Sequence, residues 1–199
     1  MSYQDSVDRS AIDGLIQYER TVRDAGMWAE MAACYHAQSH VEVTWFSGSG
    51  QDFAERSSKI AGGKVYTFHQ MSPAVVTVNG DRALADTGCS IHGLTEIDGV
   101  DIEIISHTRL LWRALREGQN WLIAGMRAFY ISDTILPQDP SSVPPIDHAV
   151  FGSLRRSYRS IAYAMTRSGA PGRDDLPGVD RPETVAALRA QELQWLTQD

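Results

Sequence analysis

One aspartate and one histidine, Asp24 and His69, have the side chains of this sequence best suited to moving a proton. Asp24 ends a stretch whose spacing predicts a helix, and the helix dipole disfavours a carboxylate at that end. Such a residue either serves a function or caps the next helix, and the sequence leaves both interpretations open. His69 lies in a predicted strand, where a structural role is the alternative to proton abstraction near neutral pH.

A second pair, His107 and Arg109, stands two positions apart in another predicted strand and therefore shares one face of the sheet. The guanidinium of Arg109 stays charged and presents several donors. With His107 it suits the stabilisation of a developing anion or a departing hydroxyl. The alternative is a solvent-facing strand face on which Glu103 pairs with Arg109.

Other familiar catalytic motifs are absent from the sequence, which contains no G-x-S-x-G, H-E-x-x-H, P-loop or G-x-G-x-x-G pattern. His36 and His40 have a spacing that chelates a metal on a helix, but Ser39 and His40 begin a predicted strand and no third ligand is evident. We therefore expect no metal and no cofactor, so the protein itself must stabilise any carbanion that it forms.

Helices are predicted to come first along the chain. Apolar residues recur at helical spacing within residues 1–26 and again from Trp28 to Tyr35, and Gly26 is placed to separate the two helices. Residues 41–46 alternate like a strand, and residues 52–61 are predicted to form a third helix.

Four longer strands are predicted to follow, over residues 65–78 with a bend or a break at Pro73, then 82–95, 102–115 and 121–130. They are joined by the turn sequences Asn79-Gly80, Asp98-Gly99 and Glu117-Gly118-Gln-Asn120. Strands joined by such short turns are antiparallel. Helices followed by an antiparallel meander predict an α+β fold.

The last third of the chain has a different character, with four prolines among Ser and Asp at its start. One amphipathic helix is predicted from Val150 to Met165. Another is indicated by the apolar stripe of Val185, Leu188, Trp195 and Leu196, after a capping box of Asp180 and Glu183. We expect residues 1–136 to form one domain. Residues 137–199 are expected to be a linker and helical extension that closes a pocket or grips a neighbouring subunit.

The order of these elements resembles the nuclear-transport-factor-2-like superfamily in its SnoaL-like branch, over about residues 9–136. The resemblance is carried by Arg23-Asp24-Ala-Gly-Met-Trp28, Phe68-His69-Gln70, Asn79-Gly80-Asp81-Arg82-Ala83, Leu110-Leu-Trp112 and Trp121-Leu-Ile-Ala-Gly125. It implies an α+β cone, in which a curved antiparallel sheet is wrapped by N-terminal helices around a pocket. The superfamily includes scytalone dehydratase, hexachlorocyclohexane dehydrochlorinase, ketosteroid isomerase and non-catalytic adaptors, so the fold alone does not settle the function.

The resemblance also implies roles for particular residues. In the resembling dehydratases and dehydrochlorinase, an Asp at the position of Asp24 partners a pocket His at the position of His69. His107 and Arg109 resemble polar residues that line the same pocket. The remaining residues expected to bind substrate are Trp28, Trp45, Phe68, Met71, His92 and Met126.

These residues and the resemblance predict a cofactor-independent lyase or isomerase, dehydratase-like, which abstracts a proton from a small cyclic or aromatic carbonyl compound. Arg23 and Trp45 stand where scytalone dehydratase has tyrosines, so a different substrate is expected. Two alternatives remain open: a non-catalytic small-molecule-binding or assembly module of the same fold, and a polyketide-type cyclase.

The composition limits the partners of the chain. Its 199 residues carry 18 Lys and Arg against 25 Asp and Glu, a net charge of -7, which argues against nucleic acid and anionic membranes as partners. No apolar run approaches the ~20 residues of a membrane span, and no signal-peptide pattern is found, so a cytoplasmic location is expected. We expect a small-molecule ligand in the pocket. The open sheet face of a one-sided cone predicts a homodimer or homotrimer.

Overall fold

The computed structural model describes residues 3–61, 65–167, 169 and 173–198. The elements within these residues, in chain order, are α1 (Tyr3–Asp24), α2 (Trp28–Ala33), β1 (Tyr35–Val43), β2 (Phe46–Gly48), α3 (Gly50–Ala61), β3 (Tyr66–Met71), β4 (Val75–Asn79), β5 (Arg82–Ile97), β6 (Val100–Glu117), β7 (Asn120–Pro137), α4 (His148–Ser153), α5 (Arg159–Arg167) and α6 (Pro182–Thr197).

The corner between α1 and α2 follows the prediction, because Gly26 has a positive φ of 73° that favours glycine. The end of α2 differs from the prediction. The prediction of a helix through Tyr35 is wrong, since α2 stops at Ala33 and Tyr35 begins β1 beside Ile123 of β7. The buried Tyr35 hydroxyl donates to Glu19 of α1 at 2.8 Å, which ties the start of β1 to the helix layer.

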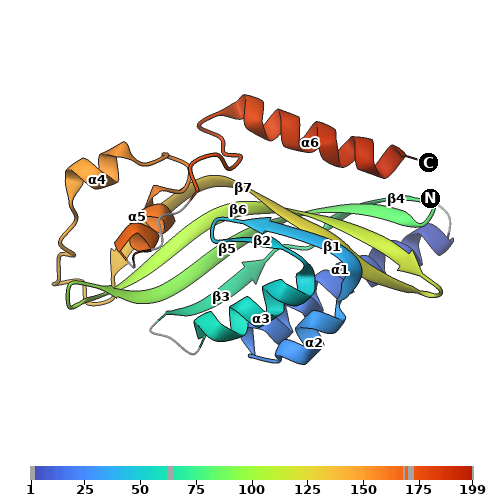
Figure 1. Cartoon of the computed structure of the whole chain (residues 1–199), viewed down its shortest axis with the longest axis horizontal. Coiled ribbons are helices and arrows are strands. Elements are labelled where there is room, and N and C mark those ends of the chain that lie inside the picture. Colours follow the sequence, from blue (N-terminus) through green and yellow to red (C-terminus); the bar gives the residue numbers. More distant parts are fainter. Residues whose placement is uncertain (1–2, 62–64, 168, 170–172, 199) are drawn as a thin grey trace.

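The strands form one open, curved sheet in the order β2-β1-β7-β6-β5-β3, with β4 also paired to β5 (Figure 1). The α+β class is confirmed, and the segment that contains Pro73 divides into β3 and β4 as expected. The sheet is mixed, however, because β1 lies parallel to β7 while the other pairs are antiparallel. The turns in the sequence specify only strands joined directly, so they carry no information on this pair.

The two faces of the sheet meet different helices. We call the face covered by α1–α3 the inner face and the face that carries α6 the outer face (Figure 1). Along β6, Leu110 belongs to the core beneath α1–α3, whereas the next residue, Leu111, packs with Leu188 of α6. Because strand side chains alternate, the parity of a residue decides which face it serves.

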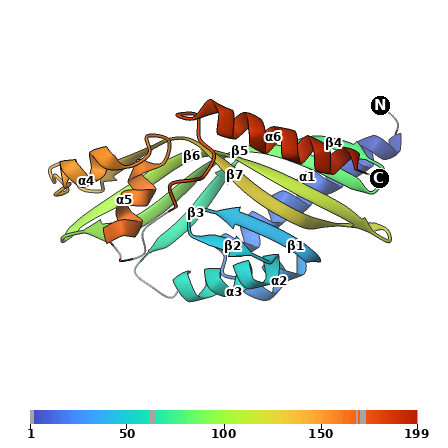
Figure 2. The same cartoon turned by 45° about the horizontal axis from the view of Figure 1, so that its top comes forward.

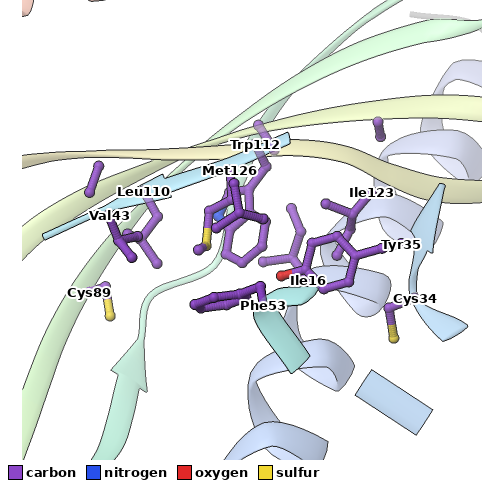
Figure 3. Packing of buried hydrophobic residues seen from close by; sticks show 14 of the residues in the cluster. Ile16, Cys34, Tyr35, Val43, Phe53, Cys89, Leu110, Trp112, Ile123 and Met126 are labelled. Carbon is purple, nitrogen blue, oxygen red and sulfur yellow. The ribbon is translucent and has the colours of Figure 1, made fainter. Parts of the chain in front are cut away.

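The main core fills the space between the inner face and the N-terminal helices. Figure 3 shows Ile16 of α1, Phe53 of α3, and Trp112 and Met126 of the sheet in contact in this space. Each of these side chains is at most 2 % exposed. Burying large apolar side chains here holds α1 and α3 against the sheet and fixes where their polar residues emerge.

The expected helix over residues 150–165 is interrupted, and that prediction is wrong. α4 ends at Ser153 and α5 begins at Arg159. Between them the buried Arg155 binds Asp180 through two nitrogens and donates to the backbone oxygens of Asp174 and Leu176. These bonds to a distant segment fix the chain in a non-helical path, which a local apolar period does not reveal.

The predicted capping box of Asp180 and Glu183 is also wrong, because the Asp180 carboxylate is bound to Arg155 and Ser157. The residue that precedes α6 is Arg181, and its side chain makes no capping hydrogen bond. α6 lies across the outer face, whereas α5 lies over the other end of the molecule (Figure 2).

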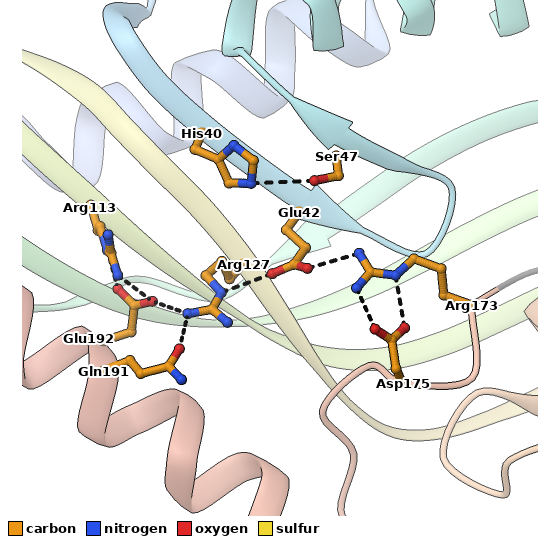
Figure 4. Close-up of polar contacts among 9 residues, drawn as sticks. All are labelled: His40, Glu42, Ser47, Arg113, Arg127, Arg173, Asp175, Gln191 and Glu192. Carbon is orange, nitrogen blue, oxygen red and sulfur yellow. Dashed lines mark hydrogen bonds and ion pairs between the residues drawn. The ribbon is translucent and has the colours of Figure 1, made fainter.

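Charged side chains attach α6 to the outer face. Glu192, which is 3 % exposed, binds Arg113 of β6 at 2.6 Å and Arg127 of β7 at 3.2 Å. Figure 4 shows how Arg127 continues to Glu42 of β1, which binds Arg173. The chain therefore covers with its own helix part of the sheet face that was expected to need a neighbouring subunit. No helix in the described part of the chain is long and apolar enough to cross a membrane.

Candidate functional site

Asp24 and His69 are in direct contact through two hydrogen bonds. Asp24 is the last residue of α1, and β3 passes beside it. One carboxylate oxygen, Oδ2, accepts the backbone N–H of His69 at 2.7 Å, and Oδ1 lies 2.9 Å from Nδ1 of the same residue. The carboxylate therefore holds both the backbone and the ring of His69.

The two interpretations of Asp24 are separated by this geometry. The residue that precedes α2 is Met27, and no side chain caps that helix. Asp24 instead receives a further hydrogen bond from Nη1 of Arg23 at 3.0 Å. Its position at the unfavourable end of α1 is thus offset by contacts with His69 and Arg23.

Burial governs the protonation of the pair. It lowers the pKa of His69 to about 4. The nearby charges of Arg20 and Arg23 reinforce this effect, and the hydrogen bond to Asp24 only partly opposes it. Burial alone would raise the pKa of Asp24, but its bonds to His69 and the charge of Arg23 leave that pKa below its ordinary value. At neutral pH the site therefore holds a neutral imidazole beside a carboxylate.

The neutral imidazole is oriented toward a cavity. With Nδ1 next to Asp24, Nε2 is the remaining ring nitrogen. His69 lines a cavity of about 500 Å³ on the inner face of the sheet. A proton on Nδ1 shared with Asp24 would leave the Nε2 lone pair free for a ligand in this cavity.

The cavity is largely apolar, and it extends along β5. Its walls include Ile91, Gly93, Thr95 and Ile97, which alternate on the inner side of that strand. At about 3.3 Å per residue, the path from Ile91 to Ile97 is roughly 20 Å long. Further walls come from the sheet and α3, as Val43, Phe53, Leu110, Met126, Ala128 and Tyr130.

The two ends of the cavity carry different polar groups. Arg20 and Arg23 of α1 and Thr67 of β3 line it together with His69. At the far end, the exposed side chains of Arg167, on α5, and Asp98, at the turn after β5, form an ion pair. α5 also contributes Ile161, Ala164 and Met165 to the wall. The C-terminal segment thus helps to enclose the cavity through α5, while α6 lies on the outer face.

Only some of the residues predicted to bind substrate reach the cavity. Trp45 and Met126 line it, together with His69. Trp28 and Met71 pack against the core of the inner side instead. Phe68 and His92 lie opposite each other on β3 and β5 and stack with ring centroids 4.4 Å apart. Each is adjacent in sequence to a residue that lines the cavity, Thr67 or Ile91. Because successive side chains of a strand point to opposite faces, Phe68 and His92 lie on the outer face.

The structure does not bring His107 and Arg109 to the cavity. Leu110 of β6 lines the cavity, so its neighbour Arg109 points to the outer face. His107, two residues before Arg109, points to the same face. His107 lies 3.0 Å from the Ser90 hydroxyl, and Arg109 donates to Asp86 at 2.7 Å. The alternative pairing of Glu103 with Arg109 is not found either, because Glu103 contacts His92 at 2.6 Å.

Three polar residues at the His69 end of the cavity were not predicted: Arg20, Thr67 and, as a functional group, Arg23. Signals for them exist in the sequence, since Arg20 is four residues before Asp24 and Thr67 is two residues before His69. Those spacings place each residue on the same helical or strand face as its predicted neighbour.

Among the described residues, no group of three or more His, Cys, Asp or Glu is arranged to hold a metal ion. Cys34 and Cys89 are both buried and both free. At the His69 end of the cavity, the ionisable groups are the imidazole of His69, the carboxylate of Asp24 beside it and the guanidinium groups of Arg20 and Arg23.

Comparison with known sequences identifies a matching family and two similar fungal proteins. Residues 4–127 match the SnoaL-like domain family. The chain is 25% identical to the PEP2-like protein NECHADRAFT_97050 of Fusarium vanettenii over 87% of its own length and 79% of that protein. It is 24% identical to pea pathogenicity protein 2 of the same fungus, over 96% and 84% of the two chains.

Known structures agree on the fold. A candidate scytalone dehydratase from Novosphingobium aromaticivorans superposes with a TM-score of 0.56 at 15% identity, covering 74% of this chain and 98% of that one. The hexachlorocyclohexane dehydrochlorinase LinA-type3 from Novosphingobium barchaimii superposes with a TM-score of 0.57 at 14% identity, covering 72% and 100%. At such identities the likeness establishes the fold alone. With the family match over most of its length, the chain belongs to the SnoaL-like domain family.

Proposed function

We propose that the protein is a cofactor-independent lyase or isomerase that abstracts a proton from a carbon atom next to a carbonyl group. His69 is the base and Asp24 orients it. The single observation that carries the proposal is the doubly bonded Asp24–His69 pair at the polar end of an apolar cavity.

The geometry suits His69 for this step. Its Nδ1 is fixed by Asp24, so that Nε2 has one direction in which to accept a proton. The second bond, from the backbone N–H of His69, keeps the carboxylate in place while the ring changes its charge. The carboxylate then stabilises the imidazolium that forms, as in other His–Asp pairs.

The proton and the electrons balance without a further reagent. The C–H bond breaks, its proton moves to Nε2 of His69, and its electron pair passes through the adjacent carbon to the carbonyl oxygen as an enolate. In a dehydration, that electron pair then returns to form the carbon–carbon double bond while the β-hydroxyl leaves with the electrons of its C–O bond. The proton on Nε2 joins the departing hydroxyl as water, and the imidazole is neutral again.

A suitable probe is 3-hydroxy-1-tetralone, a bicyclic β-hydroxyketone whose dehydration gives fluorescent 1-naphthol. Its acidic carbon, carbonyl and leaving hydroxyl lie within one ring, and the rest of the molecule is apolar like the cavity walls. We expect the protein to accelerate release of 1-naphthol above the buffer rate. In D2O we expect exchange at the carbon next to the carbonyl of 1-tetralone, which has no leaving group.

The matched variants are His69→Ala and His40→Ala. His40 is an exposed histidine of β1 that contacts Ser47 and does not line the cavity. The proposal requires that the first variant loses the acceleration and the second keeps it. Absence of both dehydration and exchange, for these ketones and for a panel of related cyclic ketones, would remove the catalytic proposal in favour of a binding module.

A further inference from the structure

Two arginines share the polar end of the cavity with His69, and the proton transfer proposed above gives them no task. Arg20 and Arg23 are three residues apart on α1, so their side chains leave the helix on one face. Both line the cavity, and the charges of both act on His69. Burying two guanidinium groups beside an apolar cavity is costly unless each is paired.

Arg20 is paired with its sequence neighbour. Its Nε and Nη2 bind the two carboxylate oxygens of Glu19, which is fully buried. The guanidinium lies 5.6 Å from the ring centroid of Phe53 and 5.5 Å from that of Trp112. These contacts fix the plane of the group, and they leave Nη1 outside its pair with Glu19.

Arg23 is held less completely. Its Nη1 donates both to Asp24 and to the Thr67 hydroxyl at 3.1 Å. Its Nε is buried and has no hydrogen-bond partner among the described residues. An unpaired donor of a charged, buried group is expensive, and it identifies a position where an acceptor would be stabilised.

The charges at this end of the cavity balance before any ligand binds. Glu19 offsets Arg20, Asp24 offsets Arg23, and His69 is neutral near pH 7. Proton transfer from carbon adds one positive charge at His69 and one negative charge on the ligand. A fixed donor near the negative charge lowers the free energy of that state without further rearrangement.

We propose that Arg20 and Arg23 form an oxyanion-binding subsite, which holds the carbonyl oxygen of the substrate as it becomes an enolate beside His69. This inference rests on the proposed function and deepens it, because it names the group that accepts the negative charge. It assigns to these two arginines the task that sequence reasoning gave to Arg109.

The shape of the cavity sets the class of substrate. The oxygen-bearing end must lie against α1, with the acidic carbon one bond from the carbonyl carbon so that Nε2 reaches its proton. The rest of the ligand extends along β5 between apolar walls toward Asp98 and Arg167. The structure therefore selects compounds with one oxygen-rich end and an elongated apolar body, bound oxygen end first.

Binding of 4-nitrophenol tests the subsite, because its phenolate mimics an enolate oxygen and its ionised form absorbs visible light. We expect the wild-type protein to bind the phenolate more tightly than 4-nitroanisole, which has the same shape without the charge. Arg23→Gln should weaken phenolate binding by about tenfold or more, as expected for loss of a hydrogen bond to a charged group. It should leave 4-nitroanisole binding within about threefold.

The matched control is Arg56→Gln, since Arg56 is an exposed arginine of α3 that does not line the cavity. It should bind both compounds like the wild type. Arg23→Lys keeps the charge but loses the planar set of donors, and an intermediate affinity is expected. Retained 4-nitroanisole binding shows that the cavity of each variant is intact.

The subsite would be overturned if the phenolate bound the wild type no more tightly than 4-nitroanisole does. It would also be overturned if the phenolate bound wild type and Arg23→Gln equally well. The two proposals fail separately. If His69→Ala still dehydrates 3-hydroxy-1-tetralone while Arg23→Gln loses its phenolate preference, the base is misassigned and the subsite stands. If His69→Ala abolishes turnover while the phenolate preference is absent throughout, the base stands and the subsite falls.

A further test of the subsite measures the pKa of His69 and does not require turnover. The positive charges of the two arginines help to hold down the pKa of His69. A bound oxyanion partly offsets them, so titration of His69 by NMR should show its pKa rising when the bound phenolate is one that stays ionised below pH 4, such as 2,4,6-trinitrophenolate. 4-Nitroanisole should produce a smaller rise, because it brings no charge.

Discussion

Two histidines of this chain contact a carboxylate through Nδ1, and they lie on opposite faces of the sheet. His69 is 2.9 Å from Asp24 on the inner face, and His92 is 2.6 Å from Glu103 on the outer face. Both side chains are at most 10% exposed. They differ in what surrounds the second nitrogen. His69 lines the cavity, whereas Nε2 of His92 is buried without a partner in the part of the chain that is described, and the ring stacks on Phe68.

Under the proposed function, a contact between a histidine and a carboxylate is not sufficient for catalysis. Proton transfer needs a second nitrogen that a substrate can approach, and donors that stabilise the charge left on the substrate. The inner pair has the cavity, Arg20 and Arg23 beside it. The outer pair has a stacked aromatic ring, so its contribution is expected in stability.

The largest expected effect is that of replacing either histidine by alanine. His69→Ala should lower kcat for 3-hydroxy-1-tetralone by about 10²–10⁴-fold, the usual contribution of a general base. His92→Ala should instead lower the free energy of unfolding by about 1–3 kcal/mol, because Glu103 loses its partner, with turnover following the folded fraction. Urea unfolding and steady-state kinetics separate the two. Similar kcat values for the two variants would erase the distinction between the faces.

Replacing the two carboxylates, Asp24 and Glu103, should give the same contrast in kcat, with a smaller effect. Asp24→Asn should reduce kcat by about tenfold or more, because the amide neither fixes the proton on Nδ1 nor stabilises the imidazolium. Glu103→Gln should leave kcat unchanged within about twofold. Asp101→Asn, at an exposed position of β6, serves as a control for the chemical change. An Asp24→Asn protein with full kcat would show that His69 needs no orienting carboxylate.

The pH dependence of activity should report the inner histidine. His69 accepts a proton only when neutral, and its pKa is about 4, so kcat/KM should be flat above pH 5 and fall tenfold per unit below about pH 4. A fall in kcat/KM that begins near the ordinary histidine pKa of 6.5 would contradict the assignment.

The same lowered pKa affects stability. The unfolded chain takes up a proton on this residue near pH 6.5, and the folded chain does so near pH 4. The free energy of unfolding should therefore decrease as the pH falls through that window, by about 3 kcal/mol in total. Subtracting the pH profile of His69→Ala from that of the wild type isolates this contribution.

The outer ion-pair network gives the smallest predicted effect on activity. Glu192→Gln removes the charge that Arg113 and Arg127 share and should lower the free energy of unfolding by about 1–3 kcal/mol. Its kcat should match the wild type, since the cavity lies on the other face. Glu183→Gln, at an exposed position of the same helix, should cost less than about 0.5 kcal/mol. A large loss of kcat in Glu192→Gln would show that the two faces are coupled.

Much of the fold could be predicted from the sequence, because its signals are local. The meander follows from turn sequences such as Asn79-Gly80, and the division at Pro73 follows from the missing backbone donor. The parallel pairing of β1 with β7 and the interruption at Arg155 could not be predicted. Both depend on contacts between residues distant in sequence, such as Tyr35 with Glu19 and Arg155 with Asp180.

The candidate site shows the same division. Asp24 and His69 were identified through a family resemblance, and the structure brings them together. The same resemblance predicts His107, Arg109 and His92 in the pocket, and Phe68 is predicted as a wall beside His69, but none of the four lines the cavity. A shift of one position along a strand turns a side chain to the other face, and no local pattern distinguishes the faces of a sheet that is covered on both.

The contact between Asp24 and the backbone of His69 has a consequence for solubility. β3 is the last strand on its side of the sheet, and an outward N–H on such a strand is a template on which another chain can pair. Asp24 occupies the N–H of His69, and it brings a negative charge to the same place. The carboxylate proposed to orient the base is thus also placed to block strand addition at this edge. We expect loss of Asp24 to favour self-association in addition to its proposed effect on catalysis.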